Sequence, residues 1–551
     1  MKYALALIIV LLIAPALAAG ASNVPRWNAA RPPAAVPEYL VVCREKAVET
    51  VAPLVRHRIA RGLSAAVLTA EDAATHFDDE NKTANQAIRA AIHALRKAGK
   101  EDGPRLRFVL VAGTANPRDQ NDLMVPTWIV PARFRGKPMF SPRLAGDNPY
   151  ATPPESLAPD LAIGRLPART LDELKTMVAK TIEAESKPAP GAWRRRIDLV
   201  AGQGGYGAVL DGLIEQVVQM VMTRAAPYRY RAAVTYANPA SPYCYDPARF
   251  GEYVIERLNA GPAVFLYAGH GSTTGFDTFR WRGEWVPIVT AHAVEALNVP
   301  HARTLVVTLC CWTGRFDGFA PAIGERLLAS PKGPSATIGA SRISQPYANA
   351  LLGLELTRHL AAAPAPTVGE ALLRAKRGLL DAEADELERM LDLVAMPVLG
   401  LRAPSQQRID QVTMINLLGD PALANPLVRG RARLTAPEAV DPGEAFDVEA
   451  AFDDLDAGRA RFELVMSRDR TRELPDPLPE NHPEAGDRMI ARHAAANNKL
   501  IAHRETNLKK GHATARLSMP EDAAPGVYYV RVYAWNDKAD ATGAAMVRVI
   551  K

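Results

Sequence analysis

The fold is decided by Ala263-Val-Phe-Leu-Tyr-Ala-Gly-His-Gly-Ser272 and by Thr304-Leu-Val-Val-Thr-Leu-Cys-Cys-Trp-Thr-Gly-Arg-Phe316. Each segment begins with a short apolar, β-branched run, which is typical of a strand buried on both faces of a parallel sheet. Each run ends at a reactive side chain beside glycine. Ligands of open α/β sheets bind outside the carboxyl ends of the strands. The pattern therefore predicts a doubly wound α/β domain with a functional site at this edge.

A histidine and a cysteine at two strand ends suit a base and its thiol nucleophile. We expect His270 to take the thiol proton of Cys311 and to return it to a leaving amine. Gly269 and Gly271 let the backbone turn beside the histidine and leave room for a substrate. The backbone N–H groups of Gly271 and Cys311 are the nearest candidates for an oxyanion hole.

Taken alone, each residue has a simpler interpretation. A cysteine that ends a buried strand usually packs as a small hydrophobe, and a single histidine is usually structural. Cys310 also competes with Cys311 for the nucleophile's role. Because adjacent strand residues face opposite sides, only one of the two can face a cleft.

The motifs and their order resemble the gingipain family of cysteine peptidases, which belongs to the caspase-like clan. The resemblance rests on hydrophobic-Gly-His-Gly-Ser at 268–272 and on Cys311-Trp-Thr-Gly-Arg-Phe316. It extends to Gly146-Asp-Asn-Pro-Tyr-Ala151, Asp160-Leu-Ala-Ile-Gly-Arg-Leu-Pro167 and Asn416-Leu-Leu-Gly-Asp-Pro421, and so spans residues 38–427. The resemblance assigns the nucleophile's position to Cys311. It also implies a carboxylate that orients His270, for which Asp160 is the candidate and Asp147 the alternate. A capping role for Asp160 remains open.

Composition narrows the class of protein. The 551 residues carry a net charge of +6 without a basic stripe, which argues against a nucleic-acid ligand. Four cysteines are too few for a disulfide scaffold; we expect Cys43 and Cys244 to be free thiols, although sequence leaves a bridge between them open. Gly202-Gln-Gly-Gly-Tyr-Gly207 matches a dinucleotide motif but lacks the acid expected about twenty residues on. We expect no cofactor and no catalytic metal.

Five segments are expected. Residues 1–18 have the charged start, the apolar run and the small-x-small site of a signal peptide, so we expect export to the periplasm or medium. Residues 19–37 form a linker or short pro-segment. Residues 38–190 form a first α/β subdomain and residues 191–427 the catalytic one. Residues 428–551 alternate apolar and polar positions, which predicts an immunoglobulin-like β-sandwich with a charged, solvated excursion at 468–510.

The sequence thus predicts an exported cysteine endopeptidase that acts on proteins or peptides, without stable membrane insertion. Its catalytic residues would be Cys311 and His270, with Asp160 as third partner. The alternative is a non-catalytic exported scaffold or adhesion protein that retains the fold. The aromatic residues between the two strands either line a substrate cleft or form a small core, and sequence leaves both open: Phe276, Phe279, Trp281 and Trp285.

Overall fold

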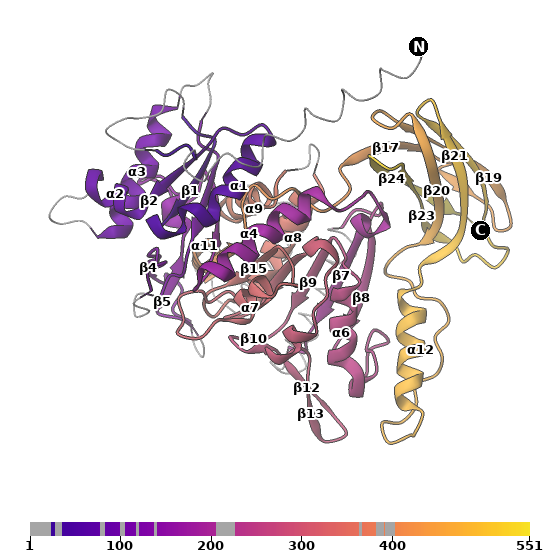
Figure 1. The fold of residues 1–551 in the computed structure, drawn as a ribbon. Helices are drawn as coiled ribbons and strands as arrows, with labels where there is room; N and C mark the ends of the chain where they lie inside the picture. Colours follow the sequence, from indigo (N-terminus) through magenta and orange to yellow (C-terminus); the bar gives the residue numbers. More distant parts are fainter. Residues whose placement is uncertain are drawn as a thin grey trace, which may run out of the picture.

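Ten strands form one continuous sheet through the larger domain, with helices on both faces (Figure 1). The computed structural model describes residues 24–27, 36–77, 83–99, 105–116, 121–136, 140–204, 226–362, 366–381, 389, 391 and 403–550. The predicted signal peptide, and most of the linker after it, lie outside these residues. The strand order is β2-β1-β3-β6-β16-β15-β14-β9-β7-β8. This confirms the predicted α/β domain.

The strands of this sheet are β1 (Tyr39–Cys43), β2 (Ala65–Thr69), β3 (Phe108–Ala112), β6 (Ala162–Leu166), β7 (Arg196–Ala201), β8 (Arg231–Tyr236), β9 (Val264–Ala268), β14 (Leu305–Leu309), β15 (Ala336–Ala340) and β16 (Ile415–Leu418). The helices are α1 (Val48–Ala60), α2 (Ala70–Phe77), α3 (Ala84–Ala98), α4 (Leu171–Ser186), α6 (Phe250–Asn259), α7 (Ile323–Ala329), α8 (Pro346–Leu360), α9 (Val368–Leu380) and α11 (Ala403–Met414). Three two-stranded antiparallel pairs lie outside this sheet: β4 (Trp128–Pro131) with β5 (Arg143–Gly146), β10 (Gly271–Ser272) with β11 (Gly275–Phe276), and β12 (Thr278–Trp281) with β13 (Glu284–Pro287).

The central strands are buried on both faces, as their apolar composition requires. Every residue of β1, β3 and β14 is buried. Within the catalytic half, β14 runs parallel to both β9 and β15, whereas β16 is antiparallel to β15. A single register pair, Leu418 with Arg165, connects β16 to β6. The two halves of the chain therefore share one sheet through a narrow joint.

A buried ion network fastens the helices of the first half to the motif at 416–421. Arg58 of α1 donates to Asp420 at 2.9 Å and to Glu185 of α4 at 2.8 Å. The Tyr39 hydroxyl also donates to Asp420 at 2.9 Å. All of these groups are removed from solvent, so each charge depends on its partners for stabilisation. The motif at 416–421 therefore has a structural role.

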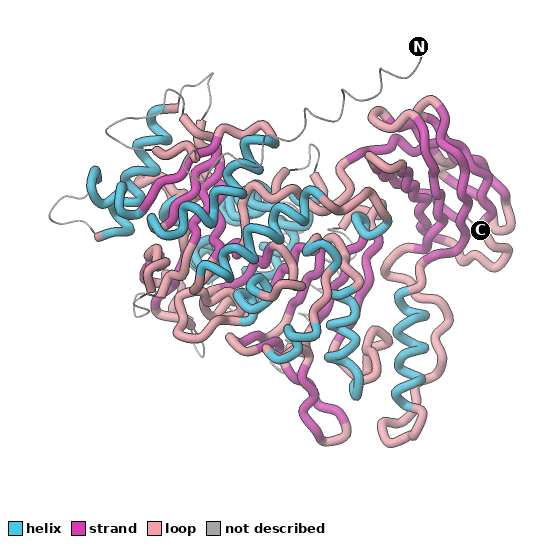
Figure 2. The backbone as a smooth tube through the Cα atoms, in the orientation of Figure 1, coloured by secondary structure: helices cyan, strands magenta, loops and turns pink. Residues whose placement is uncertain are grey.

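The C-terminal domain is all-β, as predicted. Its strands are β17 (Gly430–Thr435), β18 (Ala439–Val440), β19 (Ala445–Phe452), β20 (Ala457–Met466), β21 (Leu500–Lys509), β22 (His512–Ser518), β23 (Gly526–Trp535) and β24 (Asp540–Val549). Seven of them close into a barrel because β17 also pairs with β24. Figure 2 shows this change from a helix–strand mixture to a nearly helix-free domain.

The proline-rich part of the excursion, at 471–484, is largely exposed, as predicted, but the rest of the excursion packs against other elements. It contains helix α12 (Ala485–Asn497), which descends from the barrel toward α6 (Figure 1). Met489 joins the same hydrophobic cluster as Phe250. The Asn497 side chain accepts from the N–H of Val234 and donates to its C=O, at 2.8 and 2.9 Å. It thereby occupies backbone groups of the edge strand β8, which would otherwise be open to pairing.

Candidate active site

Strand register brings His270 and Cys311 to the same edge of the sheet. Ala268 of β9 is the partner of Leu309 of β14, and the strands are parallel. His270 and Cys311 each lie two residues beyond these partners. Adjacent strands are about 4.8 Å apart, so the two reactive residues leave the sheet side by side. The strand register thus places these two residues next to each other, at the edge where the sequence predicts a site.

The loop that carries His270 packs directly on the two cysteines. A methyl group at Gly271 would lie 2.6 Å from Cys310 Sγ and 2.9 Å from the Cys311 carbonyl oxygen. No side chain fits at such distances, so this position requires glycine for close approach. Contact at Gly271 also brings its backbone next to that of Cys311, as the predicted oxyanion hole requires.

The two cysteines face opposite ways. Cys310 is fully buried and belongs to a hydrophobic cluster with Ile323 and Leu327. Cys311 is partly exposed, and its thiol lies 3.6 Å from the Ser344 carbonyl oxygen. Of the two thiols, Cys311 is therefore the one that can meet a substrate.

A strained turn follows Cys311. Trp312 has φ of 63°, a left-handed conformation that is rare for an aromatic residue. Its N–H donates to the Arg342 carbonyl oxygen at 3.1 Å, and its ring lies against the guanidinium groups of Arg315 and Arg342. Residues held in such conformations concentrate at functional sites. The turn ends the strand sharply and leaves the Cys311 side chain at the surface.

Burial affects the thiol of Cys311. Removal from water raises the pKa of the Cys311 thiol, and the nearby Ser344 groups only partly oppose that shift. A thiol with a raised pKa needs a base before it can attack as a thiolate, which is the role that the sequence predicts for His270.

The ring of His270 is held by a main-chain carbonyl group. Its Nε2 lies 2.5 Å from the carbonyl oxygen of Gly204. A carbonyl oxygen only accepts hydrogen bonds, so Nε2 carries the proton in this contact. Nδ1 is then the nitrogen with the basic lone pair. Gly204 belongs to the predicted glycine-rich turn, whose first part thus lies at the site; Gly207 is outside the described residues.

Tyr267 holds the backbone of the histidine loop. Its hydroxyl donates to the His270 carbonyl oxygen at 2.7 Å and accepts from the Asp277 N–H at 3.2 Å. Its ring is buried and stacks on Phe276, with centroids 4.0 Å apart. Methyl groups at Gly202 and Gly269 would lie 2.9 and 2.7 Å from this hydroxyl. The sequence analysis missed this residue, which reads as an ordinary member of a buried strand.

The structure does not bring Asp160 to His270. Asp160 precedes β6 and forms an ion pair with Arg96 of α3. At the other end of β6, Arg169 donates to the carbonyl oxygens of Gly318 and Phe319, which follow Cys311 in the chain. The described partner of the Asp160 carboxylate is thus Arg96, and a role in orienting His270 stays a prediction.

The alternate carboxylate is also committed elsewhere. Asp147 is buried and accepts two hydrogen bonds from Arg165, at 2.6 and 2.8 Å, and a third from Thr127. The acid whose charge interacts with His270 is instead Asp277. Burial raises the pKa of Asp277, while the N–H of Thr278 and the charge of His270 oppose that rise. No sequence motif marked this residue.

The aromatic loop between the two strands is mostly a small core. Phe279 is fully buried and packs edge-on against Phe250, and Phe276 covers Tyr267. Only Trp285 is largely exposed, at 63%. The loop thus packs on Tyr267, which in turn donates to the main chain of His270. Among the described residues no group of three metal-ligating side chains occurs, and the cysteines Cys43 and Cys244 are free thiols.

Comparisons with known proteins follow the same motifs. The model of peptidase family C25 matches residues 33–426, more than half of the chain. Gingipain R2 of Porphyromonas gingivalis is 24% identical over 367 residues, which are 64% of this chain and 44% of that protein. Gingipain R1 of that organism is 24% identical over 397 residues, 69% of this chain and 36% of that protein. The chain thus spans less than half the length of these relatives.

Solved structures extend the likeness to both domains. The crystal structure of the Arg-specific cysteine proteinase gingipain R aligns with a TM-score of 0.52 and 18% identity. The alignment covers 93% of this chain and 98% of that chain. At this identity the likeness shows a shared fold. Within the described residues no helix is long and apolar enough to cross a bilayer.

Proposed function

Because the chain belongs to peptidase family C25, the gingipain-like cysteine peptidases, we propose that it is an exported endopeptidase. It cleaves peptide bonds in proteins, with Cys311 as nucleophile and His270 as general base. One observation carries the proposal: the loop of His270 packs on the Cys310–Cys311 pair, and only Cys311 reaches the surface.

The proposed reaction begins with the proton of the Cys311 thiol, which passes to Nδ1 of His270. The thiolate attacks the peptide carbonyl carbon, and the carbonyl electrons move to an oxyanion. The N–H groups of Gly271 and Cys311 stabilise that charge. His270 then gives its proton to the leaving amine, and the C–N bond breaks to leave a thioester. Water, deprotonated by His270, hydrolyses the thioester and restores the thiol.

Orientation of the base comes from Gly204 and Tyr267 in this proposal. The Gly204 carbonyl fixes the tautomer, and the Tyr267 hydroxyl fixes the main chain of His270. Asp277 contributes negative charge that favours the imidazolium form during the reaction.

The scaffold alternative makes a different structural prediction. A protein that kept the fold only for adhesion has no use for an accessible thiol beside an oriented imidazole. The exposure of Cys311 and the strained turn after it argue against that alternative.

We also infer that the protein is exported and that its C-terminal barrel is immunoglobulin-like. Export rests on the signal-peptide pattern at 1–18. The strand order supports the second inference: β17, β19, β22 and β21 follow one another like strands A, B, E and D, and β20, β23 and β24 like C, F and G. Strand β18 lies parallel to β24.

The test is peptide hydrolysis by the reduced, folded protein. Fluorogenic peptides should differ in the residue before the scissile bond: Arg, Lys, Asp or Leu. Peptides with Arg or Lys are tested first, because one similar structure is described as Arg-specific and one similar protein is named Lys-gingipain. We expect turnover that Cys311→Ala abolishes and Cys310→Ala retains. Equal turnover by wild type and Cys311→Ala would refute the proposal.

A further inference from the structure

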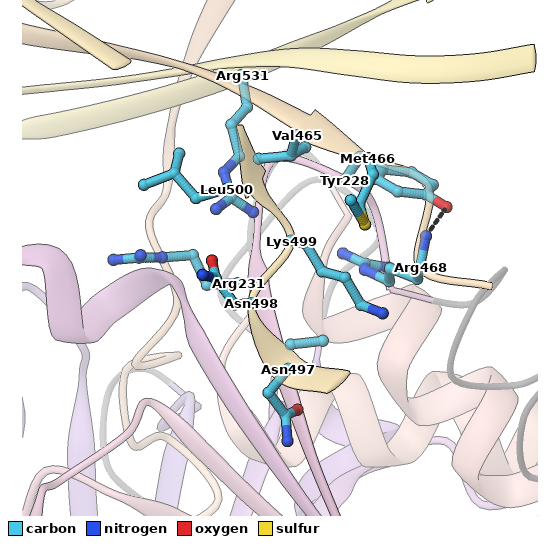
Figure 3. Close-up of a pocket in the computed structure, with 11 residues that line it drawn as sticks. Tyr228, Arg231, Val465, Met466, Arg468, Asn497, Asn498, Lys499, Leu500 and Arg531 are labelled. Atoms are coloured by element: carbon cyan, nitrogen blue, oxygen red, sulfur yellow. Dashed lines mark hydrogen bonds between the residues drawn. The ribbon is translucent and has the colours of Figure 1, made fainter. Parts of the chain in front are cut away.

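A pocket of about 80 Å³ lies where the C-terminal domain meets the edge strand of the peptidase sheet (Figure 3). Its walls come from both domains. Strand β8 contributes from the peptidase side, and β20, β21 and β23 contribute from the barrel side. The lining residues are Tyr228, Arg231, Ala232, Val465, Met466, Arg468, Asn497, Asn498, Lys499, Leu500 and Arg531.

The polar lining of this pocket is strongly basic. Figure 3 shows four cationic side chains around it, those of Arg231, Arg468, Lys499 and Arg531. The lining contains no carboxylate. Arg231 comes from the peptidase domain and the other three from the C-terminal domain, so like charges meet across the domain joint.

Some of these cations already have partners. Arg468 donates to the carbonyl oxygens of Pro227 and Tyr230, both at 3.0 Å, and its guanidinium lies over the Tyr228 ring. Lys499 donates to the Tyr243 hydroxyl at 3.3 Å. These neutral acceptors fix the side chains in place without cancelling their charge.

A single buried carboxylate behind the pocket, that of Glu463, pairs with several cations. Glu463 is fully buried and accepts from Arg531 at 2.5 Å, from Arg195 at 2.6 Å and from Arg461 at 3.0 Å. One carboxylate thus faces three guanidinium groups, and the charge of Arg231 also acts on it. The charge of Asp469 also acts on Lys499, and Arg461 donates to Glu505 as a second acceptor at 3.4 Å. The cations of the cluster still outnumber these carboxylates.

Arg195 lies behind the pocket lining and is incompletely paired. It is 1% exposed and its guanidinium lies over the Tyr533 ring, yet its Nε and one terminal nitrogen have no hydrogen-bond partner among the described residues. Burial and the neighbouring charges of Arg531 and Arg231 lower the pKa of Arg195 to about 10, although Glu463 opposes the shift. Burial likewise lowers the pKa of Lys499 to about 8. Buried charges without a counter-ion are costly, and an anion would offset that cost.

We propose that this pocket binds a small oxyanion, and that the bound anion pins the C-terminal domain to the edge of the peptidase sheet. The ligand class is phosphate, sulfate or a carboxylate group. Oxyanions accept several hydrogen bonds at once, which suits the convergent donors of arginine and lysine. The site is independent of Cys311 and of peptide hydrolysis.

Calorimetric titration of the full chain with phosphate, sulfate and succinate tests the proposal. Chloride at matched ionic strength is the reference. Thermal unfolding with millimolar anion is the second readout, because a ligand that binds only the folded state raises its stability. Succinate separates carboxylate recognition from recognition of a tetrahedral anion.

The decisive variant is Arg231→Gln, because the described structure gives the Arg231 side chain no hydrogen bond that its loss would break. We expect anion affinity about tenfold weaker, since charged hydrogen bonds are the stronger class. Arg231→Lys should recover part of it. The control Arg433→Gln removes an exposed arginine from β17 of the same domain and should leave affinity unchanged.

General salt effects give a different pattern. Excluded anions stabilise any folded protein, so they would raise the unfolding temperature of wild type and Arg231→Gln equally. That result, or the lack of any binding heat with all three anions, would overturn the proposal. Equal weakening by Arg231→Gln and Arg433→Gln would overturn it as well.

Discussion

Replacing Tyr267 by phenylalanine tests how the histidine loop is held. The variant keeps the ring that stacks on Phe276 and removes only the hydroxyl. It leaves the His270 carbonyl oxygen and the Asp277 N–H without their described partner. Both hydrogen bonds are partly buried, and losing the two costs about 2 kcal/mol of unfolding free energy. A misplacement of about 1 Å at a reacting group costs on the order of 100-fold in rate, so we expect kcat to fall at least about tenfold.

The assay pairs denaturant unfolding with steady-state kinetics on the best peptide of the panel. A positioning role predicts a lower kcat with little change in KM, because the substrate pocket is intact. Tyr253→Phe is the matched control. Tyr253 lies on α6 in the same half of the domain, and its hydroxyl makes no hydrogen bond within the described residues. Wild-type kcat and stability in Tyr267→Phe would refute this account of the loop.

Three further substitutions have defined outcomes. Gly271→Ala places a methyl group 2.6 Å from Cys310 Sγ, so the rate of peptide hydrolysis should fall about 100-fold. Adding Cys310→Ala to this variant should restore part of the activity. Full activity of Gly271→Ala alone would contradict the described packing. Asp160→Asn should change kcat/KM by less than about twofold, because the described partner of Asp160 is Arg96 of α3. A large loss of kcat/KM would instead support the predicted role beside His270. Burial raises the pKa of Glu185, but the hydrogen bond from His57 and the charge of Arg58 outweigh that and lower it to about 2, below its ordinary 4.5. The stabilisation that the Glu185 carboxylate gives the folded state is thus complete above pH 4.5 and is lost as the pH falls toward 2. Over that range the unfolding free energy of wild type, measured by urea titration, should fall by about 3 kcal/mol more than that of Glu185→Gln. Parallel pH profiles of the two proteins would contradict this.

The sheet was largely predictable because its strands have a clear sequence pattern. Apolar runs such as Tyr39–Cys43 and Leu305–Leu309 are too short for helices and stop at glycine or polar residues. His270 and Cys311 could be predicted as neighbours for the same reason, since the parallel strands β9 and β14 place the residues that follow them at one edge of the sheet.

The partner of Asp160 could not be predicted from the motif. The resemblance drew attention to the segment at 160–167 without fixing what its side chains contact. The ion pair with Arg96 depends on how α3 packs beside β6 in the folded protein. Tyr267 could not be recognised, because its partners are main-chain groups of His270 and Asp277 whose position depends on the folded loop.

The helix at 485–497 did carry a sequence signal. Met489, His493 and Ala496 recur at helical spacing and are buried against the peptidase domain. The prolines and charged residues that precede this helix made its apolar spacing hard to recognise. The closure of the barrel was not predictable, because it depends on the register between β17 and β24, two strands at opposite ends of the domain.

The most direct test of the central claim is the site of covalent labelling. The reduced protein would be treated with a peptidyl thiol-reactive probe, digested and analysed by mass spectrometry, alongside Cys311→Ala and Cys310→Ala. The account predicts one label, on Cys311, that is lost in Cys311→Ala and kept in Cys310→Ala. A label on Cys310, or labelling that survives in Cys311→Ala, would contradict it.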